Sequence, residues 1–129
     1  MYIPPWAFPM LTVNVFDFDG VVYFGGDSPG VYPGPDDLIV TGRSFEERDK
    51  TISWCQHFGI KNRIYFSQIP VRLRTRDISG YHKAITLREI LKTNRVELFF
   101  EDDPIQKAII EAMVPEVKVV HLVHDLTEK

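Results

Sequence analysis

The sequence predicts an α/β protein, with about five parallel strands in one doubly wound (Rossmann-like) sheet and helices on both of its faces. Two observations predict this class. Five short apolar segments recur along the chain, and segments with helical periodicity separate most of them. In such a fold the crossovers are right-handed, and ligands bind beyond the carboxyl ends of the strands.

Local signals define the elements of the first half. Residues 11–18 (LTVNVFDF) form a strongly apolar strand, and residues 20–37 hold five glycines and three prolines, which predict turns and a short hairpin. Residues 38–40 (LIV) form a second, short strand. A helix should follow Ser44, a favoured N-cap residue, and end just before Gly59, a typical C-terminal stop.

The second half repeats this alternation. We expect, in order, a strand at 64–66, a polar connection at 67–81, a helix from about His82 to Lys92, a strand at 96–100, a helix over roughly 105–113 and a strand at 117–123. Ala84 and Leu87 begin the apolar face of the first of these helices. Pro104 suits the first turn of the second helix.

Length and composition describe one domain, at residues 11–129, preceded by an irregular arm at residues 1–10. The chain has 129 residues, of which 44% are hydrophobic and 26% charged. Trp6 and Phe8 of the arm should pack on the domain. The formal net charge of −3 provides no overall basic field for nucleic acid or an anionic membrane, so contact with nucleic acid would need a local patch.

Cysteine content and hydropathy favour a cytoplasmic protein without a membrane partner. Cys55 is the single cysteine, so no internal disulfide can form, and we expect a buried, unreactive thiol. No apolar run approaches the ~20 residues that a membrane span needs. The first residues also lack the basic region of a signal peptide.

Polar residues close three of the expected strands. Asp17 and Asp19 end the first, residues 41–43 (TGR) end the second and residues 101–103 (EDD) follow the fourth, so all should meet at one edge of the sheet. Carboxylates at a strand end repel each other, and a divalent cation resolves that repulsion. Magnesium prefers carboxylate oxygens, water and substrate phosphate. The alternative for the first pair is a surface turn with two solvated aspartates.

Four segments resemble, in order, the motifs of the haloacid dehalogenase superfamily of aspartate-based phosphatases. Residues 13–22 (VNVFDFDGVV) resemble the first motif and residues 39–43 (IVTGR) the second. Lys83, at the start of the helix expected after the third strand, resembles the third motif, and residues 101–104 (EDDP) resemble the acidic fourth. The resemblance extends from position 11 to about position 123.

The resemblance implies a magnesium-dependent phosphatase that works through an aspartyl-phosphate. Asp17 would be the nucleophile, and Asp19 would protonate the leaving oxygen and then activate water. Thr41 and the backbone N–H of Gly42 would hold a phosphoryl oxygen, and Lys83 would offset negative charge.

The same resemblance implies a Mg²⁺ site. The ligands would be the Asp17 carboxylate, the Asp19 carbonyl and either Asp102 or Asp103. We favour Asp102, because this alignment matches Pro104 to the proline of related D-N-S-P motifs. Glu101 stands where the family more often has aspartate.

The connections bear on the substrate. Only 21 residues, positions 20–40, separate Asp19 from Thr41, and the connection after the third strand is about as short, so neither can hold a cap domain. An uncapped site suits a macromolecular phosphate such as a polynucleotide end. A small-molecule phosphatase would instead need a lid from an oligomer partner. The expected substrate-binding residues are Gly42, Arg43, Arg72, Arg74 and Arg76.

The last three of these arginines alternate along the loop, and an extended loop would align them as a phosphate-binding strip. The alternative is a solvated loop balanced by nearby acids. The four histidines share no metal-ligand spacing and are expected to pack or to face solvent; they are His57, His82, His121 and His124.

The main alternative function is a non-catalytic binding module on the same fold. The complete set of expected catalytic residues favours an enzyme over that module; the set is Asp17, Asp19, Thr41, Lys83 and Asp102. A phosphate-accepting receiver domain is disfavoured, because its acceptor aspartate normally ends the third strand, where this chain has Ser67 and Gln68.

Overall fold

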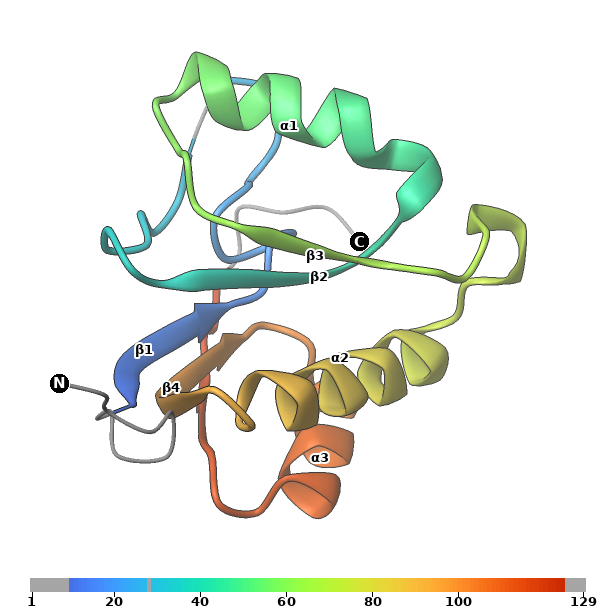
Figure 1. Cartoon of the computed structure of the whole chain (residues 1–129). Coiled ribbons are helices and arrows are strands. Elements are labelled where there is room, and N and C mark those ends of the chain that lie inside the picture. Colours follow the sequence, from blue (N-terminus) through green and yellow to red (C-terminus); the bar gives the residue numbers. More distant parts are fainter. Residues whose placement is uncertain (1–9, 28, 125–129) are drawn as a thin grey trace, which may run out of the picture.

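A computed structural model of the chain describes residues 10–27 and 29–124 (Figure 1). The expected N-terminal arm, with Trp6 and Phe8, lies outside these residues except for Met10. Within the described ranges, no helix combines the length and the apolarity needed to cross a membrane.

The structure confirms a single sheet of five parallel strands. The strands are β1 (Leu11–Phe16), β2 (Leu38–Ser44), β3 (Ile64–Ser67), β4 (Asn94–Glu101) and β5 (Lys118–His121). Their order in the sheet is β3-β2-β1-β4-β5, and every neighbouring pair is parallel. The first strand in the sequence is therefore the central strand of the sheet.

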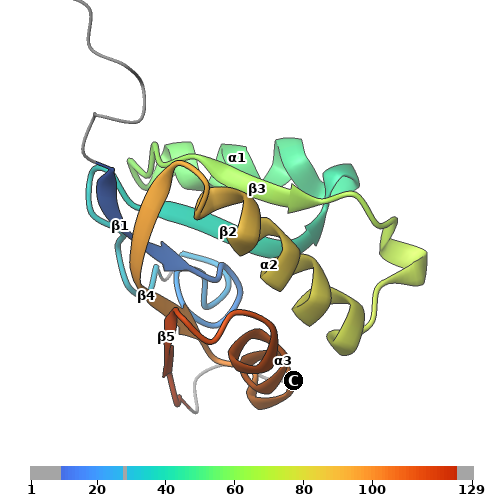
Figure 2. The same ribbon diagram turned by 60° about the horizontal axis from the view of Figure 1, so that its bottom comes forward.

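Helices cover both faces of this sheet, as the doubly wound prediction requires. Helix α1 (Arg48–His57) covers one face, whereas α2 (Arg76–Ile90) and α3 (Pro104–Met113) cover the other (Figure 1 and Figure 2). Two short 3-10 helices, η2 (Phe45–Glu47) and η3 (Val71–Leu73), precede α1 and α2. The fold class predicted from the sequence is correct.

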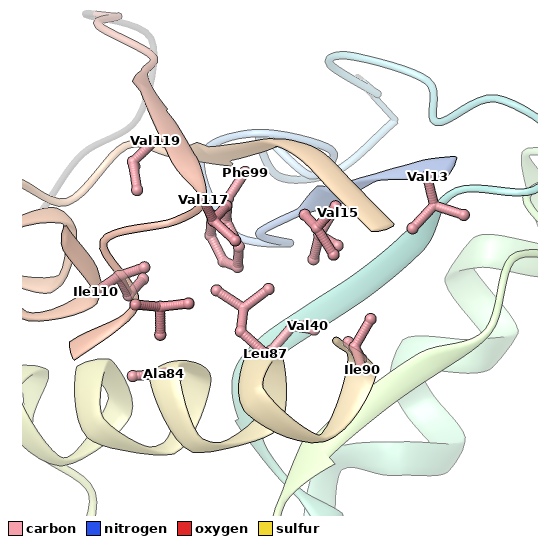
Figure 3. Packing of buried hydrophobic residues seen from close by; sticks show 12 residues of the cluster. Val13, Val15, Val40, Ala84, Leu87, Ile90, Phe99, Ile110, Val117 and Val119 are labelled. Carbon is pink, nitrogen blue, oxygen red and sulfur yellow. The ribbon is translucent and has the colours of Figure 1, made fainter. Parts of the chain in front are cut away.

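The larger hydrophobic core lies between the sheet and the α2–α3 face, and Figure 3 shows it at close range. Val15 and Val40 come from the central strands, Leu87 from α2 and Ile110 from α3, and all four are completely buried. Truncating such a buried leucine to alanine typically costs about 2–5 kcal/mol. This packing holds α2 rigidly against the sheet.

A second core on the α1 face fixes the glycine-rich connection between β1 and β2. Phe18, Val21 and Val22 follow directly after β1, and they are completely buried in the same cluster as Cys55 of α1. The Cys55 thiol is buried as predicted, and burial raises its pKa to about 11. Its low reactivity stays a prediction.

Turn chemistry explains most helix boundaries. Ser44 forms a capping box with Glu47 at the start of η2, and α1 is followed by Gly59 with a φ of +72°. Pro104 occupies the first turn of α3, and the Asp103 side chain caps that helix. These boundaries agree with the sequence prediction.

Helix α2 begins earlier than predicted. It starts at Arg76, behind the N-cap Thr75, and not near His82. Ser79 and Gly80 have low helix propensity and hide this start in the sequence. Glycine suits this position, because a Cβ at Gly80 would make a tight contact of 3.3 Å with the Gln106 Cα of α3.

The connections carry no cap domain among the described residues. Between β1 and β2, two isolated bridges hold the turns, from Tyr23 to Asp19 and from Tyr23 to Pro29. After β3 the connection contains only η3 before α2 begins. The cavity described next is therefore not covered by a second domain in this part of the chain.

Candidate active site

A cavity of about 390 Å³ lies at the carboxyl ends of β1, β2 and β4, beside the first turns of α2 and α3. This is the edge predicted from the sequence. All of the predicted site residues line the cavity except Thr41 and Arg72. Residues from five segments therefore meet at one place, as the rule for parallel sheets requires.

Asp17 lies directly after β1 and is 4% exposed. Its backbone N–H donates to the Phe100 carbonyl of β4, which fixes where the side chain leaves the sheet. The carboxylate Oδ1 lies 2.9 Å from Lys83 Nζ. Burial raises the pKa of Asp17 well above its ordinary value, and the charge of Glu101 raises it further, while Lys83 opposes both.

Lys83 lies in the middle of α2, which corrects the prediction that it opens a helix. Its buried ammonium has three N–H donors and three acceptors: Asp17 Oδ1 at 2.9 Å, Glu101 Oε1 at 2.8 Å and Gln106 Oε1 at 2.5 Å. Burial alone would lower the pKa of Lys83, but the charges of Asp17 and Glu101 raise it above its ordinary value. The lysine therefore stays charged inside the protein.

Glu101 is completely buried at the end of β4. One of its oxygens accepts from Lys83, and the other accepts from the backbone N–H groups of Asp102 and Asp103, at 3.1 and 3.2 Å. Glutamate is one methylene longer than the aspartate common in related motifs. This length lets one side chain bridge the lysine and the turn after β4.

Three carboxylates could hold a metal ion here. One oxygen each from Asp17, Glu101 and Asp102 lie within 4.8 Å of one another. Lys83 contacts two of them, Asp17 and Glu101, so three buried acids lie around one ammonium group. A divalent cation with oxygen ligands would offset the charge of the acids, so the residues fit Mg²⁺. We call Asp17, Lys83, Glu101, Asp102 and Gln106 the inner cluster.

Asp103, the other predicted metal ligand, is used differently. Its Oδ1 accepts from the backbone N–H groups of Ile105 and Gln106, at 2.8 and 3.2 Å, and so caps α3. Its Oδ2 accepts from Arg76 Nε at 2.7 Å. Burial alone would raise the pKa of Asp103, but these hydrogen bonds lower it below its ordinary value. This arrangement favours Asp102 over Asp103 as the ligand.

Asp19 and Arg43 form a bidentate pair. Arg43 Nε donates to Oδ2 at 2.9 Å and Nη2 donates to Oδ1 at 2.8 Å. The guanidinium also donates to Thr51 Oγ1 at 3.0 Å and lies 4.8 Å from the ring centroids of both Phe18 and Tyr23. Arg43, which the sequence suggested as a substrate ligand, is therefore engaged with the second aspartate of the motif.

Thr41 and Gly42 differ in their access to the cavity. Thr41 is completely buried, and its Oγ1 accepts from the Arg43 backbone N–H at 3.0 Å. Gly42 lines the cavity, and a Cβ there would lie 2.7 Å from Ser79 Oγ. The close approach of α2 to β2 therefore requires glycine at this position.

The arginines after β3 do not form the predicted strip, because the segment is not extended. Arg72 lies in η3 and does not line the cavity. Arg74 Nη1 lies 2.5 Å from Glu47 Oε1, and Arg76 Nε lies 2.7 Å from Asp103 Oδ2. Both arginines line the cavity, and each is paired with an acid, of which only Asp103 also lines the cavity. We call Asp19–Arg43, Glu47–Arg74 and Asp103–Arg76 the rim pairs.

Sequence reasoning did not assign Gln106, Ser79 or His124 to the site. Gln106 stands two residues after Pro104, so the predicted start of α3 could have placed it at this edge. Ser79 depends on the start of α2, which was misplaced. His124 Nε2 lies 3.1 Å from Asp102 Oδ2, and no local signal announces this contact.

No protein-family model and no curated protein matches the chain. The resemblance to the haloacid dehalogenase superfamily thus rests on the four motifs.

Proposed function

We propose that the chain is a magnesium-dependent phosphatase of the haloacid dehalogenase type, with Asp17 as its nucleophile. The observation that carries the proposal is the inner cluster, in which buried Asp17 shares one lysine with Glu101 beside Asp102. Burying several carboxylates with one ammonium is costly for folding. A binding site for a cation and a phosphoryl group accounts for that cost.

The proposed reaction has two steps. An oxygen of the Asp17 carboxylate attacks phosphorus, and the bond from phosphorus to the leaving oxygen breaks. That oxygen takes a proton from Asp19, which enters this step as the carboxylic acid and leaves it as the carboxylate paired with Arg43. Water then attacks the phosphorus of the aspartyl-phosphate and gives a proton to Asp19. The bond between phosphorus and Asp17 breaks, which releases phosphate and restores the carboxylate.

Positive and polar groups around Asp17 support this chemistry. Lys83, 2.9 Å from Asp17, offsets the charge of the nucleophile and of the phosphoryl group. Gly42 lines the cavity and Thr41 does not, so the Gly42 backbone is the better candidate to contact a phosphoryl oxygen. We assign Thr41 to holding the backbone of this turn through Arg43.

Asp17 and Asp102, with the Asp19 carbonyl, would hold the magnesium ion. When bound there, magnesium polarises the phosphoryl oxygens and reduces their repulsion from the carboxylates. Glu101 is the least available of the three acids, because both of its oxygens already accept hydrogen bonds. Its role is to hold Lys83 and the turn that carries Asp102.

Within this function we propose a macromolecular phosphate, such as a polynucleotide end, as the substrate. Arg74 and Arg76 line a cavity that has no cap among the described residues. They could contact phosphates next to the one that is cleaved. A small substrate with a lid from an oligomer partner is the alternative that a comparison of substrates tests.

The test is phosphate release with and without Mg²⁺, from an aryl phosphate and from oligonucleotides with a 3′- or 5′-phosphate. We expect Mg²⁺-dependent release that Asp17→Asn abolishes and Asp49→Asn leaves unchanged, since the Asp49 side chain is 99% exposed. Equal release by wild type and Asp17→Asn contradicts the proposal. Mg²⁺ binding without release from any substrate favours the non-catalytic binding module.

A further inference from the structure

His124 contacts the carboxylate that we propose as a metal ligand. Its Nε2 lies 3.1 Å from Oδ2 of Asp102, and the two side chains are only 10% and 4% exposed. Solvent therefore does not compete for this contact. An imidazole N–H beside a buried ligand carboxylate is the arrangement by which proteins fix the orientation of metal ligands.

The segment after β5 holds His124 in this position. The Leu122 N–H donates to the Glu101 carbonyl at 2.9 Å, which continues the pairing with β4 beyond the end of β5. His121 Nε2 lies 3.0 Å from the backbone carbonyl oxygen of Asp102. The His124 ring packs edge-on against Phe24, with centroids 4.8 Å apart. One segment thus contacts both the backbone and the side chain of Asp102.

Gly20 completes the enclosure of this pair. It follows Asp19 in the turn after β1 and has a φ of +82°. A Cβ at Gly20 would lie 1.9 Å from Asp102 Oδ2 and 3.0 Å from His124 Nε2. The backbone of the first motif therefore leaves room for the pair only because this residue has no side chain.

We propose that His124 is a positioning residue that donates its Nε2–H to Asp102 and thereby sets the affinity of the site for a divalent cation. The inference deepens the proposed function and rests on it only for the assignment of Asp102 as a metal ligand. It differs from direct ligation by histidine, because Nε2 faces the carboxylate oxygen at hydrogen-bond distance.

The test measures Mn²⁺ and Mg²⁺ binding without turnover, by electron paramagnetic resonance of Mn²⁺ and its displacement by Mg²⁺. His124→Leu should raise the Kd for both ions by about 10- to 100-fold, as loss of such partners typically does. His124→Gln keeps an N–H donor and should show a smaller rise. The control His57→Leu changes an exposed histidine of α1 and should bind as wild type does.

Gly20→Ala supplies a second variant, so that the test does not depend on one protein folding. Its Cβ would displace Asp102 and His124, and we expect a similar rise in Kd. Unchanged affinity in His124→Leu and His124→Gln overturns the inference. So does ¹⁴N coupling to bound Mn²⁺ that disappears in His124→Leu, because it would make His124 a ligand.

The two proposals fail in different ways. Cation binding that depends on Asp102 and His124, in a protein that releases no phosphate, supports the inference while the phosphatase proposal fails. Phosphatase activity with wild-type cation affinity in His124→Leu supports the phosphatase and overturns the inference. A wild-type protein that binds neither ion overturns the inference as well.

Discussion

The inner cluster and the rim pairs, Glu47 excepted, line the same cavity but balance their charges in opposite ways. At the rim, each acid has its own arginine, as in Asp19–Arg43, and the pairs are partly exposed. In the inner cluster, Asp17 and Glu101 share Lys83 and Asp102 lies beside them, and the ion-paired side chains are at most 5% exposed. The difference indicates that a divalent cation fits the inner cluster better than the rim, because three acids there lie around one ammonium group.

The comparison also limits what the rim can do. A phosphate that reaches Arg74 or Arg76 competes with an acid that already occupies the guanidinium. Exposed ion pairs of this kind typically contribute about 0–1 kcal/mol. In the proposed function, Arg74 and Arg76 of the rim would therefore contribute only weakly to the choice of substrate.

The largest effect should follow from Lys83→Met. This change leaves Asp17 and Glu101 buried without their shared cation, and breaking such a pair typically costs about 3–5 kcal/mol. The free energy of unfolding from urea titration measures the loss. Lys92→Met, which removes an exposed lysine, is the matched control and should change stability little.

A second substitution sharpens this first prediction. Adding Glu101→Gln to Lys83→Met removes one of the uncompensated charges, so part of the lost stability should return. Equal stability of Lys83→Met and wild type would contradict the view that the inner cluster holds uncompensated negative charge.

The next effect concerns Arg43→Gln. This change removes two hydrogen bonds to Asp19 and should lower kcat by about 10- to 100-fold. The effect should be smaller than that of removing Asp19 itself, because a general acid–base group contributes a factor of about 10²–10⁴ to the rate. Steady-state kinetics with an aryl phosphate measures it. If Arg43 acts only through Asp19, the double variant with Asp19→Asn is no slower than Asp19→Asn alone. If the two substitutions lower kcat additively, Arg43 acts independently of Asp19, as a substrate-binding residue would.

A smaller effect should follow from Asp103→Ala. The side chain caps α3, and losing such a cap typically costs about 1 kcal/mol. Arg76→Ala removes only the exposed partner of this acid and should cost less. Thermal unfolding of the two variants ranks them. A larger loss for Arg76→Ala would show that the rim pair, rather than the cap, holds this turn.

The smallest effect should come from Arg74→Ala, with Arg72→Ala as its control. Arg74 lines the cavity, so KM for a phosphorylated oligonucleotide should rise, by about fivefold at most for an exposed contact. KM for an aryl phosphate should stay unchanged. Arg72 does not line the cavity and should affect neither substrate. Equal increases of KM for the oligonucleotide in both variants would support the continuous basic strip that the sequence predicted.

Local patterns predicted the features that depend on neighbours in the sequence. Five apolar segments gave the sheet, and Ser44, Gly59 and Pro104 marked helix ends through their own backbone and capping chemistry. Asp17 and Asp102 reached the same cavity because the parallel strands β1 and β4 end at one edge. The start of α2 was not predicted from the sequence. Ser79 and Gly80 have low helix propensity, and both lie where α2 packs closely against neighbouring elements.

Partners that meet across the fold were beyond the sequence. Arg43 pairs with Asp19, and Arg76 pairs with Asp103. Both ion pairs depend on how β2, α2 and α3 pack together. The contact between His124 and Asp102 links residues that are 22 positions apart, across β4 and β5. No periodicity or motif in the sequence indicates such a contact. Residue types therefore predicted which side chains belong to the candidate site, but not which of them contact each other.

The position of β1 in the centre of the sheet has a consequence for synthesis on the ribosome. Leu11 pairs with Asn94 of β4, so the first strand to emerge waits for most of the chain before its second edge is covered. Pairing over such a long sequence separation is slow. Until it is complete, the edge of β1 that pairs with β4 is exposed and prone to aggregation. A nascent chain that stops before β4 also lacks three acids of the cavity, Glu101, Asp102 and Asp103. Folding and the assembly of the cavity are therefore completed late, nearly together.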